Sequence, residues 1–291
     1  MPPAVVEALR RDPEARVLTV VQEFVNQSVA LGFDNPNGYA VSPPADFARC
    51  AAWLTGQIPA DTHRTFLNRP TPALCDQFAI NYLLTYAADP GTPPGWTRLW
   101  SDSRFALWQS DRRRPRAEIF YDARPTTHEE AARAMRSGAL RPTRDLFVEG
   151  PASGEESSGS HSGATRATGE ASSVEFVGAS GNRRTYRVAM ARPGWLLLRE
   201  TWQPGWRVRV DGREASVRRA QMCLMAAPVP AGAHRVEFFY RPRSVVVGLA
   251  VTLATLTALA IAALRRTPLT PAAPGARSLR VEGSRNSAVC P

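Results

Sequence analysis

Apolar and polar positions follow both helical and strand periods in the first 150 residues. Phe47, Cys50, Ala51 and Leu54 recur at i, i+3, i+4 and i+7, which predicts one buried helix face. Short apolar runs between polar turns predict strands instead. These runs are residues 17–24, 79–86, 104–109, 116–121 and 145–149. The mixture of periods indicates an α/β or α+β arrangement for this part of the chain.

Residues 174–240 are nearly all of strand type. Alternating or continuous apolar runs are separated by turns about every ten residues, which is typical of a β-sandwich. Asp211-Gly212 lies between two such runs and predicts a two-residue hairpin. Pro204-Gly205 suits the centre of a type II turn, because glycine accepts a positive φ. The expected fold class is therefore α+β: a mixed α/β subdomain, then an antiparallel β-sandwich.

One apolar segment follows the last predicted strand. Val245–Leu264 contains twenty residues without a charge or a proline, and arginines flank it on both sides. At 1.5 Å per residue, such a helix spans about 30 Å, the thickness of a bilayer core. We therefore predict a C-terminal transmembrane helix over residues 243–266 and the lipid bilayer as a partner.

Two segments are too poor in large apolar residues to form a core. Residues 151–173 are rich in Ser, Gly, Ala and Thr, and residues 267–291 follow the predicted span. We expect a flexible linker and a disordered tail there. The resulting division is an α/β subdomain at 1–150, a linker at 151–173, a sandwich subdomain at 174–242, the helix and the tail.

Composition narrows the function classes. The net charge is +10, and every basic residue is Arg, a bias that reflects genome composition as much as any partner. The four Cys lack C-x-x-C spacing and the four His are scattered, which excludes a zinc module and a disulfide scaffold. A Cys50–Cys75 bridge stays open. No cofactor or metal is predicted, and nucleic acid is not an expected partner, because no binding motif is present.

Motifs in the second half resemble the C-terminal end of the YfhO-like family of bacterial membrane proteins. The pattern runs through a strand, a P-G-W turn, a D-G hairpin, a P-A-G-x-H strand, a Y-x-P segment and a final membrane helix. The residues that carry it are Pro204, Gly205, Trp206, Asp211, Gly212, Pro230, Ala231, Gly232, His234, Tyr240 and Pro242.

The first half resembles the same family through shorter motifs. Asn35 with Gly38-Tyr39 is similar to an Asn…Gly-Tyr loop, Asn81-Tyr82 to a conserved strand, and Pro115-Arg116-Ala117 to a strand start. The resemblance covers nearly all of residues 15–265. Asn35, Tyr39, Asn81, Tyr82 and Arg116 are therefore candidate contacts for an acceptor or glycan, although bracing of loops is the alternative role.

The resemblance implies a glycosyltransferase of GT-C architecture, which uses a polyprenyl-phosphate sugar to decorate envelope polymers. The family's catalytic residues lie in a multi-span bundle that has no counterpart here, so we predict no catalytic residue in this chain. The expected partners are a separately encoded multi-span membrane bundle, a polyprenyl-phosphate sugar or an envelope polymer. The alternatives are a non-enzymatic, membrane-anchored glycan-binding or assembly module, or an inactive fragment.

Charge around the span predicts its orientation. The tail holds five arginines against one acid, so the positive-inside rule places the C-terminus in the cytoplasm and residues 1–242 outside. The N-terminus has no apolar signal segment, so we expect export information upstream or a split gene. A cytoplasmic main domain with an external tail is the alternative.

Other side chains allow two interpretations. Trp195, Trp202 and Trp206 suit either sugar stacking or a structural role. Asp211 suits a turn, and His234 a structural position on its strand. Paired carboxylates support glycosyl chemistry when they face each other across a sugar. The candidates, which no sequence spacing pairs, are Asp34, Asp46, Glu149, Glu200 and Asp211.

Overall fold

The computed structural model describes residues 1–24, 27–39, 44–56, 64–65, 67, 70–88, 94–150 and 172–265. Most of the predicted linker, the predicted tail and the side chain of Tyr39 lie outside this part. Two compact units are present, residues 1–243 and residues 244–291. The expected α+β class is confirmed, since most strands are antiparallel and the helices lie between them in sequence.

A four-stranded sheet lies near the N-terminus. Its order is β1 (Val17–Thr19), β4 (Tyr82–Tyr86), β6 (Phe105–Ser110) and β5 (Trp96–Ser101). Helix α1 (Pro3–Arg10) packs Val5 and Leu9 against one face of this sheet, in a core that includes Leu84 and Leu107. The other face is also apolar, because Leu18, Leu83 and Trp108 belong to a second core.

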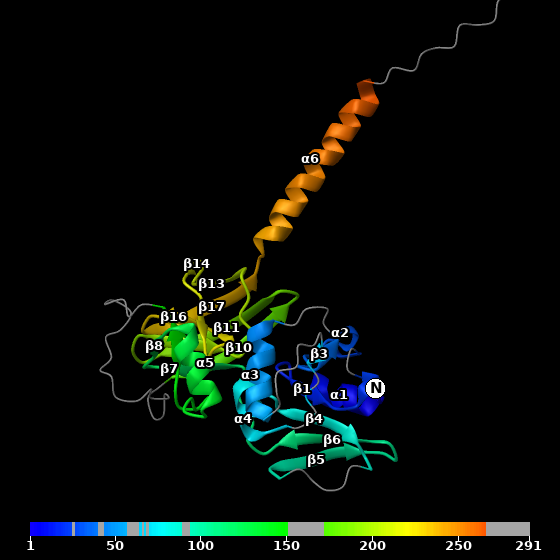
Figure 1. Ribbon diagram of the computed structural model, residues 1–291, viewed down its shortest axis with the longest axis vertical. Helices are drawn as coiled ribbons and strands as arrows, with labels where there is room; N and C mark the ends of the chain where they lie inside the picture. Colours follow the sequence, from blue (N-terminus) through cyan, green and yellow to red (C-terminus); the bar gives the residue numbers. More distant parts are fainter. Residues whose placement is uncertain are drawn as a thin grey trace, which may run out of the picture. The chain divides into compact units, whose positions relative to one another are not determined.

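Helices α3 (Ala45–Thr55), α4 (Pro72–Phe78) and α5 (His128–Arg136) contribute to that second core, and α3 contacts both other helices (Figure 1). Thr127 and Glu130 form a capping box at the start of α5. The remaining short elements are a 3₁₀ turn at Gln22–Phe24, α2 (Gln27–Leu31), β2 (Gly38–Tyr39) and β3 (Arg64–Thr65).

Two predicted strands are shorter than expected. The first ends at Thr19, because the chain turns at Gln22–Phe24 and brings Phe24 into the core beside α1. The second begins at Tyr82, since Ala79 ends helix α4 in a left-handed conformation with φ 51°. In both cases helical or turn backbone replaces the first or last residues of an apolar run.

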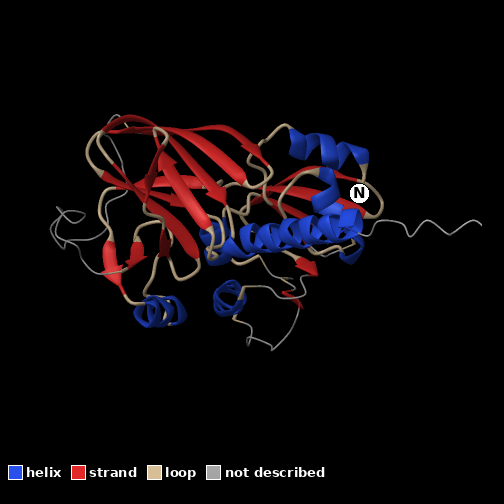
Figure 2. Ribbon diagram, turned by 90° about the horizontal axis from the view of Figure 1, so that it is seen from above, coloured by secondary structure: helices blue, strands red, loops and turns tan. Residues whose placement is uncertain are grey.

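Two larger sheets pack face to face. The five-stranded sheet has the order β10 (Ser173–Ser180), β11 (Arg183–Met190), β17 (Gly232–Tyr240), β13 (Trp206–Val210) and β14 (Arg213–Ala215). The six-stranded sheet has the order β7 (Ala117–Phe120), β12 (Gly194–Leu198), β16 (Leu224–Val229), β15 (Arg218–Ala220), β9 (Phe147–Glu149) and β8 (Arg124–Thr126). In Figure 2 these strands lie together, on the side of the molecule away from the label N.

Strand β12 is buried on both faces. Leu196 and Leu198 enter the sandwich core with Val188 and Phe238 of the five-stranded sheet. Trp195 and Leu197 point the other way, into the core shared with the helices. Because successive strand residues alternate between faces, a continuous apolar run is what such a central strand requires.

The predicted boundary at residues 151–173 does not separate the sheets. β7, β8 and β9 precede it, yet they pair with β12 and β15, which follow it. The sandwich therefore takes strands from both sides of the predicted linker. Backbone pairing explains this, because β12 has two edges and β7 fills the one that β16 leaves open.

The last helix, α6, spans Arg243–Arg265. It is long and apolar enough to cross a membrane, with a mean hydropathy of 2.4 over its most apolar window. None of its residues is buried within the chain, as expected of a helix whose natural solvent is lipid rather than a protein core.

Candidate functional site

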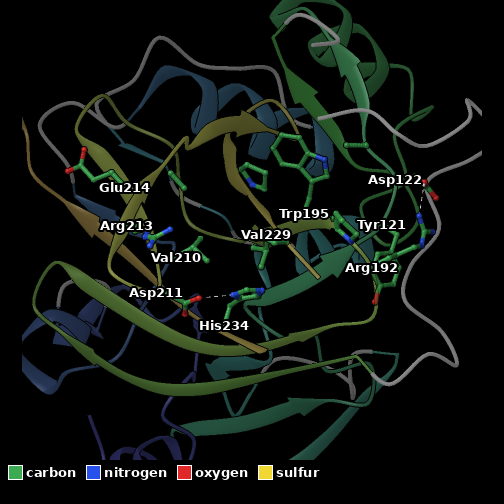
Figure 3. Close-up of a pocket in the computed structure, with 16 residues that line it drawn as sticks. Tyr121, Asp122, Arg192, Trp195, Val210, Asp211, Arg213, Glu214, Val229 and His234 are labelled. Atoms are coloured by element: carbon green, nitrogen blue, oxygen red, sulfur yellow. Dashed lines mark hydrogen bonds and ion pairs between the residues drawn. The ribbon is translucent and has the colours of Figure 1, made fainter. Parts of the chain in front are cut away.

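The larger of the two pockets described here lies at one end of the sandwich, between the two sheets (Figure 3). Its volume is about 820 Å³. The six-stranded sheet contributes the ends of β7, β12 and β16, and the five-stranded sheet contributes the β13–β14 hairpin and β17. We call it the sandwich pocket. Its lining comprises Tyr121, Asp122, Ala123, Arg192, Pro193, Gly194, Trp195, Val210, Asp211, Arg213, Glu214, Ala215, Pro228, Val229, Pro230 and His234.

Close strand packing fixes the aromatic side of the sandwich pocket. A Cβ atom on Gly194 would lie 2.8 Å from the carbonyl oxygen of Phe120, so only glycine lets β12 approach β7 this closely. Trp195 follows directly and is largely buried. The Tyr121 hydroxyl accepts a hydrogen bond of 3.0 Å from the Ala191 N–H, which holds the second ring in place.

An ion pair lies beside the Tyr121 ring. The Arg192 guanidinium lies 4.4 Å from the centre of the Tyr121 ring, and its Nη1 is 3.7 Å from Asp122 Oδ1. Both side chains are partly exposed, so their remaining hydrogen-bonding atoms can reach a ligand.

A second polar pair lies on the opposite side of the sandwich pocket (Figure 3). His234 Nδ1 is 2.7 Å from Asp211 Oδ2, and the His234 Nε2 is 3.1 Å from the carbonyl oxygen of Ala231. The hydrogen bond to Asp211 raises the pKa of His234 and lowers that of Asp211. Asp211 Oδ1 also accepts from the Arg235 N–H at 2.8 Å.

The predicted hairpin positions Asp211. Asp211 and Gly212 have φ of 51° and 80°, and Val210 pairs with Arg213, which is a two-residue loop of the I′ kind. Asp tolerates this conformation because its short side chain bonds to nearby backbone. The same residue therefore closes the turn and lines the sandwich pocket.

This arrangement suits a polyhydroxylated ring. Tyr121, Val210 and Val229 line an apolar wall, and the polar pairs on either side offer both donors and acceptors. Each pair combines a basic and an acidic side chain, so neither pair leaves an unbalanced charge in the sandwich pocket. Among the described residues, no group of three or more metal-ligating side chains could hold a metal ion.

Comparison with known families supports the assignment made from the motifs. Residues 171–252 match the family described as bacterial membrane protein YfhO. This match covers less than half of the chain, and over that segment it confirms the resemblance to the YfhO family. Comparison with curated proteins and with solved structures gives no significant match.

The YfhO motif residues gather at two places in the structure. Asp211, Gly212, Pro230 and His234 belong to the sandwich pocket or its hairpin. The Ala231 carbonyl oxygen contacts the His234 ring, and Gly232, with φ 116°, starts β17 beside that ring. The others lie where β17 ends before α6. These are Pro204, Gly205, Trp206, Tyr240 and Pro242.

The predicted contact residues of the first half lie in loops and at strand ends, outside the lining of the sandwich pocket. Asn81 bonds both ways to the backbone of Arg114, at 2.8 Å each. Asn35 Oδ1 accepts from the Asn37 N–H at 3.0 Å. The Tyr82 hydroxyl donates to Asp12 at 3.0 Å. Each of these described bonds braces a loop or a strand end.

Arg116 belongs to a buried ion network that joins the two halves of the chain. It pairs with Asp34 and Glu200, and Arg184 contacts the same two carboxylates at 2.7 Å each. Arg16 reaches Glu200 at 3.0 Å. Burial opposes the charge on Glu200, but the surrounding guanidinium groups prevail and lower its pKa.

The structure brings together carboxylates that sequence spacing does not pair. Asp34 and Glu200 meet at Arg116, as described above. Asp46 and Glu149 meet at His128, with Nε2 3.3 Å from Asp46 and Nδ1 2.7 Å from Glu149. Arg219 contacts both carboxylates and stacks on Trp202 at 4.2 Å. Cations separate the members of each pair, so neither resembles a catalytic pair across a sugar.

The three described cysteines, Cys50, Cys75 and Cys223, are free and buried. The bridge between Cys50 and Cys75 that the sequence left open is therefore absent from this structure. Burial raises the pKa of the Cys75 thiol to about 12, which makes it a core residue rather than a reactive group.

Sequence reasoning did not select Tyr121, Asp122 and Arg192, which form one side of the sandwich pocket. They lie in connections at 121–123 and 191–193, outside the YfhO motifs quoted above. Only the pairing of β7 with β12 brings those connections together. Gly194-Trp195 is the local signal, because a glycine before a buried aromatic residue in a strand marks a close backbone approach.

Proposed function

We propose that residues 1–242 form an extracytoplasmic, membrane-anchored module that binds a sugar unit of a cell-envelope polymer during glycosyl transfer. The sandwich pocket is the proposed binding site, and it handles the acceptor rather than performing the chemistry. The observation that carries this proposal is the apolar wall of Tyr121, Val210 and Val229 between two polar pairs. YfhO-type segments with the same hairpin and strand motifs are expected to share the sandwich pocket.

An uncharged sugar is the favoured ligand class. Phosphate is favoured where arginines outnumber carboxylates, whereas Arg192 and His234 are each matched by one carboxylate here. A sugar ring instead uses alternating donors and acceptors around an apolar face. We therefore expect neutral hexoses of the polymer, not its phosphate groups, to occupy the sandwich pocket.

Calorimetric titration of the full-length protein in detergent with neutral envelope-type oligosaccharides tests the proposal. Arg192→Gln removes charged hydrogen bonds and should weaken binding about tenfold or more. Arg187→Gln is the matched control, because Arg187 lies on β11, outside the sandwich pocket, and pairs with Glu175. Equal affinities in the two variants, or no binding of any such glycan by the wild type, would contradict the proposal.

The orientation is a separate part of the proposal. Five arginines at or after the end of α6 favour a cytoplasmic C-terminus. Protease added to intact spheroplasts should then degrade residues 1–242 and leave a short fragment that contains α6. Full protection of the main domain, with digestion only after lysis, would reverse the orientation without affecting the sandwich pocket itself.

A further inference from the structure

Three strand ends meet where the chain leaves the sandwich toward α6. The Tyr240 N–H donates to the Asn182 carbonyl oxygen at 2.9 Å, and the Asn182 side chain donates back to the Tyr240 carbonyl oxygen. The Arg241 N–H donates to the Gly205 carbonyl oxygen at 2.8 Å. The turn before β13 and the loop before β11 therefore hold the last residues of β17.

A second pocket, of about 290 Å³, opens at this point. The Trp206 and Tyr240 rings lie side by side in its wall, with centroids 5.5 Å apart, and the Tyr240 hydroxyl donates to Gln203 at 3.3 Å. We call it the exit pocket. It is lined by Gly181, Asn182, Arg183, Arg184, Glu200, Thr201, Gln203, Trp206 and Tyr240.

Positive charge dominates around the exit pocket. Arg241 and Arg243 are exposed, and no acidic side chain of the described residues lies within ion-pair distance of either. Arg183 is about half exposed and lies 3.6 Å from Glu237. The one carboxylate in the lining, Glu200, is already contacted by Arg16, Arg116 and Arg184.

Chain connectivity ties the exit pocket to the start of the predicted span. Two residues separate the end of β17 from the first residue of α6, and three backbone steps cover at most about 11 Å. If α6 begins at the edge of the hydrocarbon core, Tyr240 lies at the depth of the lipid headgroups. Aromatic rings and arginines are the side chains that favour this layer.

We propose that the exit pocket binds the phosphate of an anionic phospholipid headgroup. Arg183 of the pocket wall and the exposed Arg241, which follows Tyr240 in the chain, supply the charge. The Trp206–Tyr240 pair packs against the glycerol region. The proposal requires that α6 enters the bilayer, but it is independent of the sandwich pocket and of glycan binding. Its consequence is that bound lipid helps to fix the main domain at the membrane surface.

Native mass spectrometry of the full-length protein from mixed phosphatidylglycerol and phosphatidylcholine micelles tests this inference. The wild type should retain phosphatidylglycerol preferentially, and Arg183→Gln and Arg241→Gln should each lower that retention about fivefold. Arg187→Gln, on the same strand as Arg183, is the charge-matched control and should retain the lipid fully. Unchanged thermal unfolding of each variant verifies that the fold is intact.

Two outcomes overturn the inference. The first is equal retention of phosphatidylglycerol by wild type and by the Arg183→Gln/Arg241→Gln double variant. The second is displacement of the lipid by free glycerol phosphate at low millimolar concentration, which would assign the exit pocket to a soluble phosphate. Loss of glycan binding would leave the inference untouched, since that result concerns the other pocket.

Discussion

The turn at Pro204-Gly205 gives the sharpest test of how the main domain is built. Gly205 has φ 119°, and a Cβ atom there would lie 2.8 Å from Pro242 Cα and 3.0 Å from Pro242 N. Gly212 has φ 80°, but a Cβ atom there would meet no atom within 4 Å. Replacing each glycine by alanine therefore separates backbone conformation from close approach.

The two substitutions should differ in their free energy of unfolding. A positive φ costs a non-glycine residue about 1–2 kcal/mol, and Gly212→Ala should lose only that amount. Gly205→Ala adds an overlap with backbone atoms that cannot rotate away, which costs about 1–3 kcal/mol more. A shift of Pro242 also strains the bond between Arg241 and Gly205, worth about 1 kcal/mol.

Thermal unfolding of the full-length protein in detergent, followed by near-ultraviolet circular dichroism, measures this difference. A difference of about 2 kcal/mol corresponds to about 4–8 °C in Tm for a folded unit of this size. Gly205→Ala should therefore melt at least that far below Gly212→Ala. Equal melting temperatures would refute the close approach of the turn to Pro242.

Three further predictions concern charged groups. Glu118→Gln should destabilise the protein by about 3–5 kcal/mol in chemical denaturation, because it leaves the buried Arg199 without its paired carboxylate, and Glu118→Leu/Arg199→Met should recover most of the loss. Burial acts to raise the pKa of Asp34, but the arginine partners outweigh burial and lower this pKa to about 2. The contribution of Asp34 to stability should therefore be complete above pH 3.8 and lost toward pH 2. Asp34→Asn should show no such loss over that interval. The raised pKa of His234 gives a pH dependence of stability with the opposite sign. The ionic contribution of His234 is complete below pH 6.5 and disappears as the pH rises through the folded-state pKa. The difference in stability between wild type and His234→Gln should therefore narrow at alkaline pH.

Local signals in the sequence determined the elements that depend on neighbouring residues. Asp211-Gly212 produced the expected hairpin, and Thr127 with Glu130 caps the start of α5. The apolar segment ending at Leu264 formed α6, and the ordered motifs identified the YfhO segment. Turn chemistry, capping and periodicity act over a few residues, so they can be read directly from the chain.

Tertiary structure alone decided which strands share a sheet and which side chains share a site. β7 pairs with β12 across more than seventy residues, and that pairing places Tyr121 and Arg192 beside Trp195. The network around Arg116 likewise joins Asp34 to Glu200. Such contacts depend on strand order, register and burial, for which one sequence carries no local signal, because many partners of similar apolar character compete for each strand edge.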